Sequence, residues 1–219
     1  MKILVACEYS GRVRDAFLKK GHDAMSCDLF QTESPGPHYQ GDVFAVINDG
    51  WDMMIAHPPC TYLTVSGNRS FLNNPERWKQ RLDAMLFVHA LLNADIEKIC
   101  IENPQGVIST HIRPPDQYIQ PYEFGYPESK KTGLWLKNLP LLVPSKIVDP
   151  IWVITADGKR HSPTHARINN SKIRSLTYHG IADAMADQWG SAGKYVAPVV
   201  PIRRAEQGEL FAENEFNRR

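Results

Sequence analysis

Short continuous apolar runs recur through the first half of the chain, and a polar stretch follows each of them. Such runs are typical of strands that are buried on both faces of a parallel sheet. A further short element is expected around residues 41–43, where Gly-Asp precedes apolar residues. The apolar runs predict strands at residues 2–7, 23–27, 53–56 and 99–101.

Apolar residues at helical spacing lie between these runs. Residues 11–20 predict a helix that ends at Gly21, because glycine is favoured just after a helix. Residues 75–94 predict a longer helix, which Asn74 can cap, and a last helix is predicted at 181–189. The apolar residues along one side of the long helix are Trp78, Leu82, Met85, Leu86 and Leu92.

This alternation of strands and helices predicts an α/β fold with a doubly wound, mostly parallel sheet. From Gln105 onward prolines cluster and apolar runs are short, which indicates a small irregular or β-rich lobe. After Pro201 the chain is polar, so we expect a disordered tail. The expected parts are an α/β core (1–112), a minimal substrate-recognition region that is partly core (113–177), a helix returning to the core (178–197) and the tail (198–219).

The composition, 42% hydrophobic and 22% charged over 219 residues, is that of an ordinary globular protein. No apolar run approaches the roughly 20 residues of a membrane span, and Glu8 comes too early for a signal peptide. The four cysteines lack Cys-x-x-Cys spacing, which indicates a reducing compartment without disulfides or structural zinc. We therefore expect a cytoplasmic protein without a metal site or a membrane partner.

The charge is unevenly distributed although the net charge is only +1. Residues 108–176 contain ten Lys/Arg and five Asp/Glu, so this segment is basic and the remainder is acidic. A basic segment of this kind is either a phosphate-facing surface or a solvated lysine-rich face.

Two prolines and a cysteine directly follow the apolar run at 53–56. Pro58 and Pro59 lack amide donors and fix φ, so the strand must end there. Cys60 then lies on a stiff turn at the carboxyl end of a strand, where open α/β sheets bind ligands. It is either a nucleophile or a buried structural cysteine, and His57 either contacts a substrate or fills the strand end.

Glu102 and Asn103 also end a predicted strand, so they and Cys60 are expected along one edge of the sheet. A thiolate can add to an electron-poor ring carbon. A neighbouring carboxylic acid can protonate the adjacent ring nitrogen and spread the developing charge. This pair suits conjugate addition to C6 of a pyrimidine, which makes C5 nucleophilic.

The motifs resemble those of the DNA cytosine-5 methyltransferase family over about the first half of the chain. D-M-M-I-A-H-P-P-C-T-Y-L-T-V-S-G at 52–67 is similar to the family's hallmark, an apolar strand followed by Pro-Cys and Ser-Gly. I-E-N-P at 101–104 is similar to its Glu-Asn-Val motif. A glycine-bearing strand–turn–helix, an acidic residue after the second strand and Gly-Asp precede them in the family's order. The resemblance implies a Rossmann-like methyltransferase fold and methyl transfer from S-adenosyl-L-methionine to C5 of cytosine in DNA.

The same resemblance implies a role for each matching residue. Cys60 is the nucleophile, Glu102 is the acid at the ring nitrogen, and Asn103 braces the Cys60 loop. Ser66 and Gly67 lie on the substrate side of that loop. The residues implied to contact S-adenosyl-L-methionine are Ala6, Glu8, Ser10 and Gly11 in the first turn, Asp28 at the ribose, Asp42 at the adenine, Pro58, and Gly180 in a closing helix.

The first turn departs from the family's pattern, because residues 7–11 contain one glycine where the family has several. The pocket must therefore be shaped differently, although a turn at a helix N-terminus can still hold the cofactor's carboxylate. The family's Gln-x-Arg-x-Arg motif corresponds only to residues 125–131. There Lys130 is the candidate active-site cation, which keeps the charge but loses the planar fork of arginine.

Little chain remains for target recognition, since typical members insert a long recognition domain. The enzyme therefore reads a short DNA site, or it acts on single-stranded DNA or a free cytidine nucleotide, which need no base flipping. A further alternative is a non-catalytic DNA-binding module with a decayed cofactor pocket. The sequence looks like that of a phage or bacterial protein.

Two large apolar residues stand out in the polar tail, in Q-G-E-L-F at 207–211. Leu210 and Phe211 either dock on the parent domain or belong to a binding peptide. Together with Gln207 they resemble the short motif by which bacterial proteins bind the replication sliding clamp. A tether of this kind would raise the enzyme's effective concentration on DNA.

Overall fold

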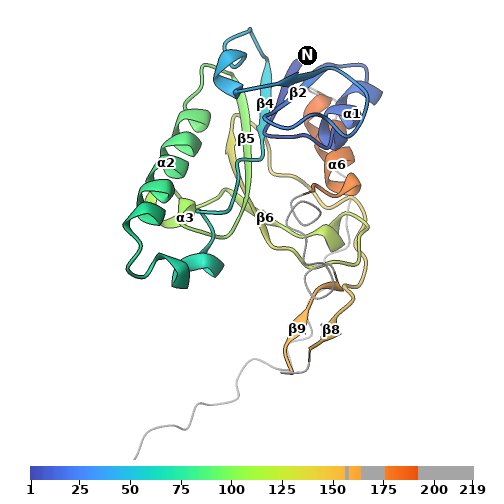
Figure 1. The fold of residues 1–219 in the computed structure, drawn as a ribbon. Coiled ribbons are helices and arrows are strands. Elements are labelled where there is room, and N and C mark those ends of the chain that lie inside the picture. The colour runs from blue at the N-terminus through green and yellow to red at the C-terminus, as the bar shows by residue number, and fades with distance from the viewer. Residues whose placement is uncertain (156–157, 164–175, 192–219) are drawn as a thin grey trace, which may run out of the picture.

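A seven-stranded sheet lies at the centre of the computed structural model, which describes residues 1–155, 158–163 and 176–191. Its strands are β1 (Lys2–Ala6), β2 (Asp23–Asp28), β3 (His38–Gln40), β4 (Met53–Ala56), β5 (Lys98–Pro104), β6 (Gln117–Ile119) and β7 (Thr132–Lys137). Their order is β3-β2-β1-β4-β5-β7-β6; Figure 1 labels β2, β4, β5 and β6 of this sheet. The pairs among β1 to β5 are parallel, whereas β7 runs antiparallel to both of its neighbours.

This topology confirms the predicted fold class, a Rossmann-like methyltransferase fold with a doubly wound, mostly parallel sheet. The chain starts at β1 in the middle of the sheet, adds β2 and β3 on one side and then crosses to β4 on the other. The strand order therefore reverses between β1 and β4, and open α/β sheets bind ligands outside the carboxyl ends of the strands at such a point.

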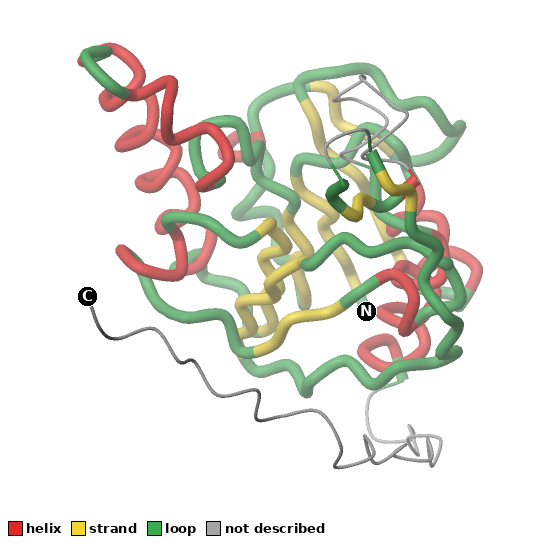
Figure 2. Tube along the Cα trace, turned by 90° about the horizontal axis from the view of Figure 1, so that it is seen from below, coloured by secondary structure: helices red, strands yellow, loops and turns green. Residues whose placement is uncertain are grey.

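Helices cover both faces of the sheet (Figures 1 and 2). Helices α1 (Arg12–Lys19) and α6 (His179–Gly190) lie on one face, and α2 (Pro75–Leu92) and the short α3 (Ile108–His111) lie on the other. Ile3 and Val5 of β1 belong to the first core, and Leu4 and Ala6 belong to the second. Burial on both faces explains why these strands are continuous apolar runs in the sequence.

Helix α2 confirms the long predicted helix, and the Asn74 side chain accepts a hydrogen bond from the Arg77 amide as expected. The side of α2 that faces the core is not the apolar side expected from the sequence. Trp78, Leu82 and Leu86 are 55%, 53% and 58% exposed. The buried residues of the helix are Arg81, Val88 and Leu91.

The third strand lies at His38–Gln40, ahead of the predicted position. Residues 41–43 instead form a turn and the start of the 3-10 helix η1 (Val43–Ala45), because the Asp42 side chain caps that helix. The segment predicted as an irregular lobe supplies β6 and β7 to the main sheet and a separate hairpin of β8 (Val153–Ile154) and β9 (Arg160–His161).

Trp135 of β7 is fully buried, whereas Trp152, directly before β8, is 43% exposed. The tail at 198–219 and its Gln207, Leu210 and Phe211 lie outside the described residues. Within the described part of the chain, no helix is both long and apolar enough to cross a membrane.

Candidate active site at the carboxyl edge of the sheet

The ends of four parallel strands bring the predicted site residues to one edge of the sheet. Ala6 of β1 is in register with Cys27 of β2 and with Ala56 of β4, which is in turn in register with Ile101 of β5. The residues that follow these positions are therefore at the same level. They are Cys7, Asp28, His57 and Glu102, with Glu8, Cys60 and Asn103 further along the chain.

The Cys60 turn is tied to the end of β5. The Cys60 carbonyl accepts hydrogen bonds from the amides of Leu63 (3.0 Å) and Thr64 (3.1 Å), which close the turn. Asn103 is 1% exposed, and its Nδ2 donates to the Pro58 carbonyl at 2.7 Å. The expected contact between Asn103 and the Cys60 loop is therefore present.

Two further elements hold the same loop. The Val107 amide donates to the Leu63 carbonyl at 2.8 Å, and a Cβ added to Gly106 would lie 2.0 Å from that carbonyl oxygen. From α2, Arg81 Nε donates to the Tyr62 carbonyl at 2.7 Å, which explains why this arginine faces inward. A loop held from three sides keeps Cys60 in a fixed place, which favours a reacting group.

Glu102 is paired with His57 beside this loop. His57 Nδ1 lies 2.7 Å from Glu102 Oε2, and each side chain is 10% exposed. Burial would raise the pKa of Glu102, but the hydrogen bond and charge of His57, together with Lys130, hold it below its usual value. Glu102 is therefore a carboxylate with a hydrogen-bond partner inside the protein.

Lys130 lies within electrostatic reach of this pair. Its charge acts to lower the pKa of both His57 and Glu102. Its Nζ is 6.0 Å from the ring centroid of Tyr178, whereas the neighbouring Lys131 lies over Tyr118 at 4.2 Å. Of these two lysines, Lys130 is the one placed beside the carboxyl edge of β5.

Asp28 and Asp42 gather on the β2 side of the edge. Cys27 is near both, since burial and then the charges of Asp28 and Asp42 raise its pKa to about 11. Asp28 Oδ1 accepts from the Phe30 amide at 2.9 Å, and Asp42 Oδ1 accepts from the Phe44 amide at 3.0 Å. Two carboxylates held in this way suit a ligand that is rich in hydroxyl and amino donors.

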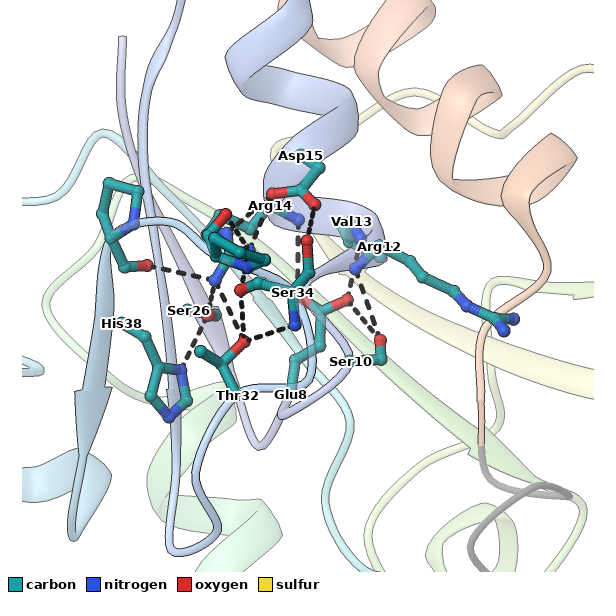
Figure 3. A network of polar contacts seen from close by, with 12 residues as sticks. Glu8, Ser10, Arg12, Val13, Arg14, Asp15, Ser26, Thr32, Ser34 and His38 are labelled. Carbon is teal, nitrogen blue, oxygen red and sulfur yellow. Dashed lines mark hydrogen bonds and ion pairs between the residues drawn. The ribbon is translucent and has the colours of Figure 1, made fainter.

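The N-terminus of α1 holds a carboxylate of the protein itself (Figure 3). Glu8, 4% exposed, accepts hydrogen bonds from the Val13 amide at 2.7 Å and the Arg14 amide at 3.3 Å. The Arg12 amide donates to Ser10 Oγ, which in turn donates to Glu8. Glu8 therefore accepts from the Val13 and Arg14 amides, at the place that the sequence suggested for the cofactor's carboxylate.

Arg14 fixes the loop that follows Asp28 (Figure 3). This arginine was not predicted as a site residue from the sequence. Its side chain is fully buried, and its guanidinium donates to the Ser34 carbonyl at 2.9 Å and to Ser26 Oγ at 3.0 Å. It also forms an ion pair with Asp15 at 2.8 Å. Gly11 leaves room for this guanidinium, since an added Cβ there would lie 2.4 Å from Arg14 Nη2.

The other residues expected to contact the cofactor or the substrate are placed by their backbone contacts and packing. Ala6 is fully buried, and its carbonyl accepts from the His57 amide at 2.9 Å. Pro58 is buried at the foot of the Cys60 turn. Gly180 packs tightly in the first turn of α6, where an added Cβ would lie 1.9 Å from the Phe124 carbonyl oxygen. Ser66 and Gly67 lie in the 3-10 helix η2 (Val65–Phe71).

No family model matches the sequence, and no curated protein matches it. Among solved structures, the chain is similar to a proposed DNA modification methyltransferase encoded within an E. coli prophage, at 16% identity and a TM-score of 0.45, over 69% of this chain and 52% of that one. It is also similar to the Entamoeba histolytica methyltransferase EhMeth, at 14% identity and a TM-score of 0.45, over 68% of this chain and 57% of that one. The matched part spans little more than half of each of these proteins.

Proposed function

We propose that this chain transfers a methyl group from S-adenosyl-L-methionine to C5 of cytosine in DNA, through a covalent bond between Cys60 and C6. The observation that carries the proposal is the arrangement at the ends of β4 and β5. There Asn103 ties the Cys60 turn to the strand that also presents Glu102. A thiol on a fixed turn beside a buried charged pair suits addition to a pyrimidine ring.

The residues on the β2 side fit the nucleoside part of S-adenosyl-L-methionine. Asp28 would accept from the ribose hydroxyls and Asp42 from the adenine amino group, since each carboxylate is held through one oxygen by a backbone amide. The bound cofactor supplies an electrophilic methyl group. Its carboxylate needs a binding place other than the α1 amides, which Glu8 and Ser10 occupy.

The hydrogen bonds of Glu8 at the N-terminus of α1 favour a second candidate, a DNA-binding module that has lost its cofactor. A protein carboxylate at the N-terminus of α1 replaces the open glycine-rich turn that the family uses. The intact arrangement of Cys60, Glu102 and Asn103 argues against this candidate. Methyl transfer to single-stranded DNA or to a free cytidine nucleotide keeps the enzyme and changes only the substrate.

Incubation with labelled S-adenosyl-L-methionine separates these functions. Duplex DNA, single-stranded DNA and dCMP are offered separately, and label in 5-methylcytosine is measured after digestion. We expect transfer to DNA. Label only in dCMP would identify a nucleotide enzyme, and DNA binding without cofactor binding or transfer would identify the non-catalytic module.

Asp28→Ala is expected to weaken S-adenosyl-L-methionine binding by about 10- to 100-fold. The reason is that the ribose hydroxyls lose a charged acceptor, and such hydrogen bonds contribute about 1.5–3 kcal/mol. Isothermal titration calorimetry measures the change, and Asp23→Ala, an exposed position at the start of the same strand, serves as the control. Equal affinities of the two variants would remove Asp28 from the cofactor site.

The tail is the proposed contact to a bacterial sliding clamp, through Gln207, Leu210 and Phe211. A peptide spanning residues 205–214 is expected to bind a bacterial clamp, because the Leu-Phe pair would fill an apolar pocket and glutamine would add hydrogen bonds. Fluorescence anisotropy measures the binding. A peptide with the three residues changed to alanine is the control, and equal binding by both peptides would refute the contact.

A further inference from the structure

His57 is fixed from its backbone and from one side of its ring. Its amide donates to the Ala6 carbonyl at 2.9 Å, which continues the pairing of β4 with β1. Its Nδ1 lies 2.7 Å from Glu102 Oε2, so the Nδ1–H group donates a hydrogen bond to the carboxylate. An imidazole held in this way has one defined orientation, and any proton it offers to a ligand must come from Nε2.

Nε2 of the same ring is buried, and it has no hydrogen-bond partner among the described residues. A buried donor without a partner costs about 1–3 kcal/mol, and such groups are rare in proteins unless they have a role. This one lies at the carboxyl edge of the sheet, three residues before Cys60. The missing partner is therefore expected to be an acceptor atom of the substrate.

Charges around the ring favour the imidazolium form of His57. Burial acts to lower the pKa of His57, but the hydrogen bond and charge of Glu102, followed by the charge of Glu8, raise it above its ordinary value. Lys130 acts in the opposite direction. Asp28 also lies within reach, because the charge of His57 acts to lower the pKa of that carboxyl.

We propose that His57 is a further catalytic residue, which donates its Nε2 proton to N3 of the cytosine while Glu102 holds the imidazole. This inference rests on the proposed function. In the step, the Cys60 thiolate forms a bond to C6, the C5–C6 double bond shifts to C4–C5, and the C4–N3 electron pair moves to N3. N3 takes the Nε2 proton, and the neutral imidazole stays hydrogen-bonded to Glu102. Glu102 thus positions the donor rather than supplying the proton.

His57→Gln tests this role, because glutamine can hydrogen-bond to Glu102 but cannot transfer a proton. The rate of adduct formation between Cys60 and a 5-fluorocytosine oligonucleotide is measured by mass spectrometry in the presence of S-adenosyl-L-methionine. We expect a decrease of roughly 10²- to 10⁴-fold, the usual contribution of general acid catalysis. The DNA affinity of His57→Gln is expected to stay within about threefold of that of the wild type. The matched control is His89→Gln on the exposed side of α2.

The pH profile separates proton donation from a structural role. The pKa of His57 is raised, so the imidazolium is present below that pKa and is lost as the pH rises through it. In the wild type the rate is expected to fall along this alkaline limb, which lies above pH 6.5. In His57→Gln the limb is expected to disappear. If His57→Gln is slow but its rate still falls at alkaline pH, or if it reacts as fast as the wild type, the role of His57 is refuted. The proposed methyl transfer is not affected by either result.

A measurement on the wild type covers the case in which His57→Gln does not fold. Nitrogen NMR of the labelled histidines is expected to show His57 as an imidazolium that becomes neutral when the adduct is trapped. A His57 signal that the adduct leaves unchanged overturns the proposal. A wild type that forms neither adduct nor 5-methylcytosine on any cytosine substrate instead overturns the proposed function, and the role of His57 falls with it.

Discussion

Replacing Cys60 by serine is expected to abolish methyl transfer, with S-adenosyl-L-methionine affinity near that of the wild type. Sulfur is needed for the bond to C6, because a serine hydroxyl is a far weaker nucleophile at neutral pH. The residues proposed to bind the cofactor, Asp28 of β2 and Asp42 at the N-cap of η1, are held by nearby backbone amides and do not depend on the thiol. Label transfer and calorimetry on the same preparation measure both properties.

The other cysteines make this test specific. Burial raises the pKa of the Cys7 and Cys100 thiols, which disfavours the reactive thiolate at both positions. Cys100→Ala therefore serves as the control that keeps transfer, measured at a temperature where it is folded. A 5-fluorocytosine oligonucleotide should add its mass at Cys60 in the wild type. Full activity of Cys60→Ser, or an adduct on another cysteine, would exclude the covalent mechanism.

The sequence predicted the parallel half of the sheet well, since strands buried on both faces leave an unmistakable pattern. The strand at 53–56 has the predicted bounds, and the end of β5 places Glu102 and Asn103 as expected. The strands β6 and β7 were not predicted individually. They lie in a proline-rich segment with short apolar runs, and they are strands because β7 pairs with β5 and β6 pairs with β7, rather than because of a local pattern.

Side-chain partners were harder to predict than strands. The orientation of α2 was misleading because Arg81 faces inward to hold the Cys60 loop, while Trp78 and Leu82 face outward. The first turn was read as an altered cofactor loop. Only the structure shows that Glu8 there binds the amides of Val13 and Arg14.

His57 illustrates the same limit inside the site. In the sequence it is a histidine before two prolines, and no local signal distinguishes a ligand-binding residue from one that only packs at the end of the strand. Its partner Glu102 is 45 residues away, and the register of β4 with β5 brings the two together. A bond of this kind depends on sheet pairing, which local sequence does not encode.

Arg14→Met is expected to lower the free energy of unfolding by about 3 kcal/mol, as is common when a buried charged partner is removed. Methionine fills a similar volume, but the Ser34 carbonyl, Ser26 Oγ and the Asp15 carboxylate each lose the guanidinium as a hydrogen-bond donor. For a chain of this size such a loss corresponds to roughly 6–12 °C in Tm. Urea denaturation measures the free energy, and differential scanning calorimetry measures Tm.

Cofactor affinity is expected to fall in Arg14→Met as well, because the segment that the guanidinium holds begins directly after Asp28 and includes Ser34. Arg14→Lys should recover only part of the stability, since an ammonium cannot reproduce the planar fork. Lys19→Met, an exposed position on the same helix, is the control and should change stability by less than about 0.5 kcal/mol. If Arg14→Met is as stable as Lys19→Met, the buried guanidinium does not hold this loop. If Arg14→Met is stable but binds the cofactor weakly, the Arg14 side chain contributes to ligand binding and not to stability.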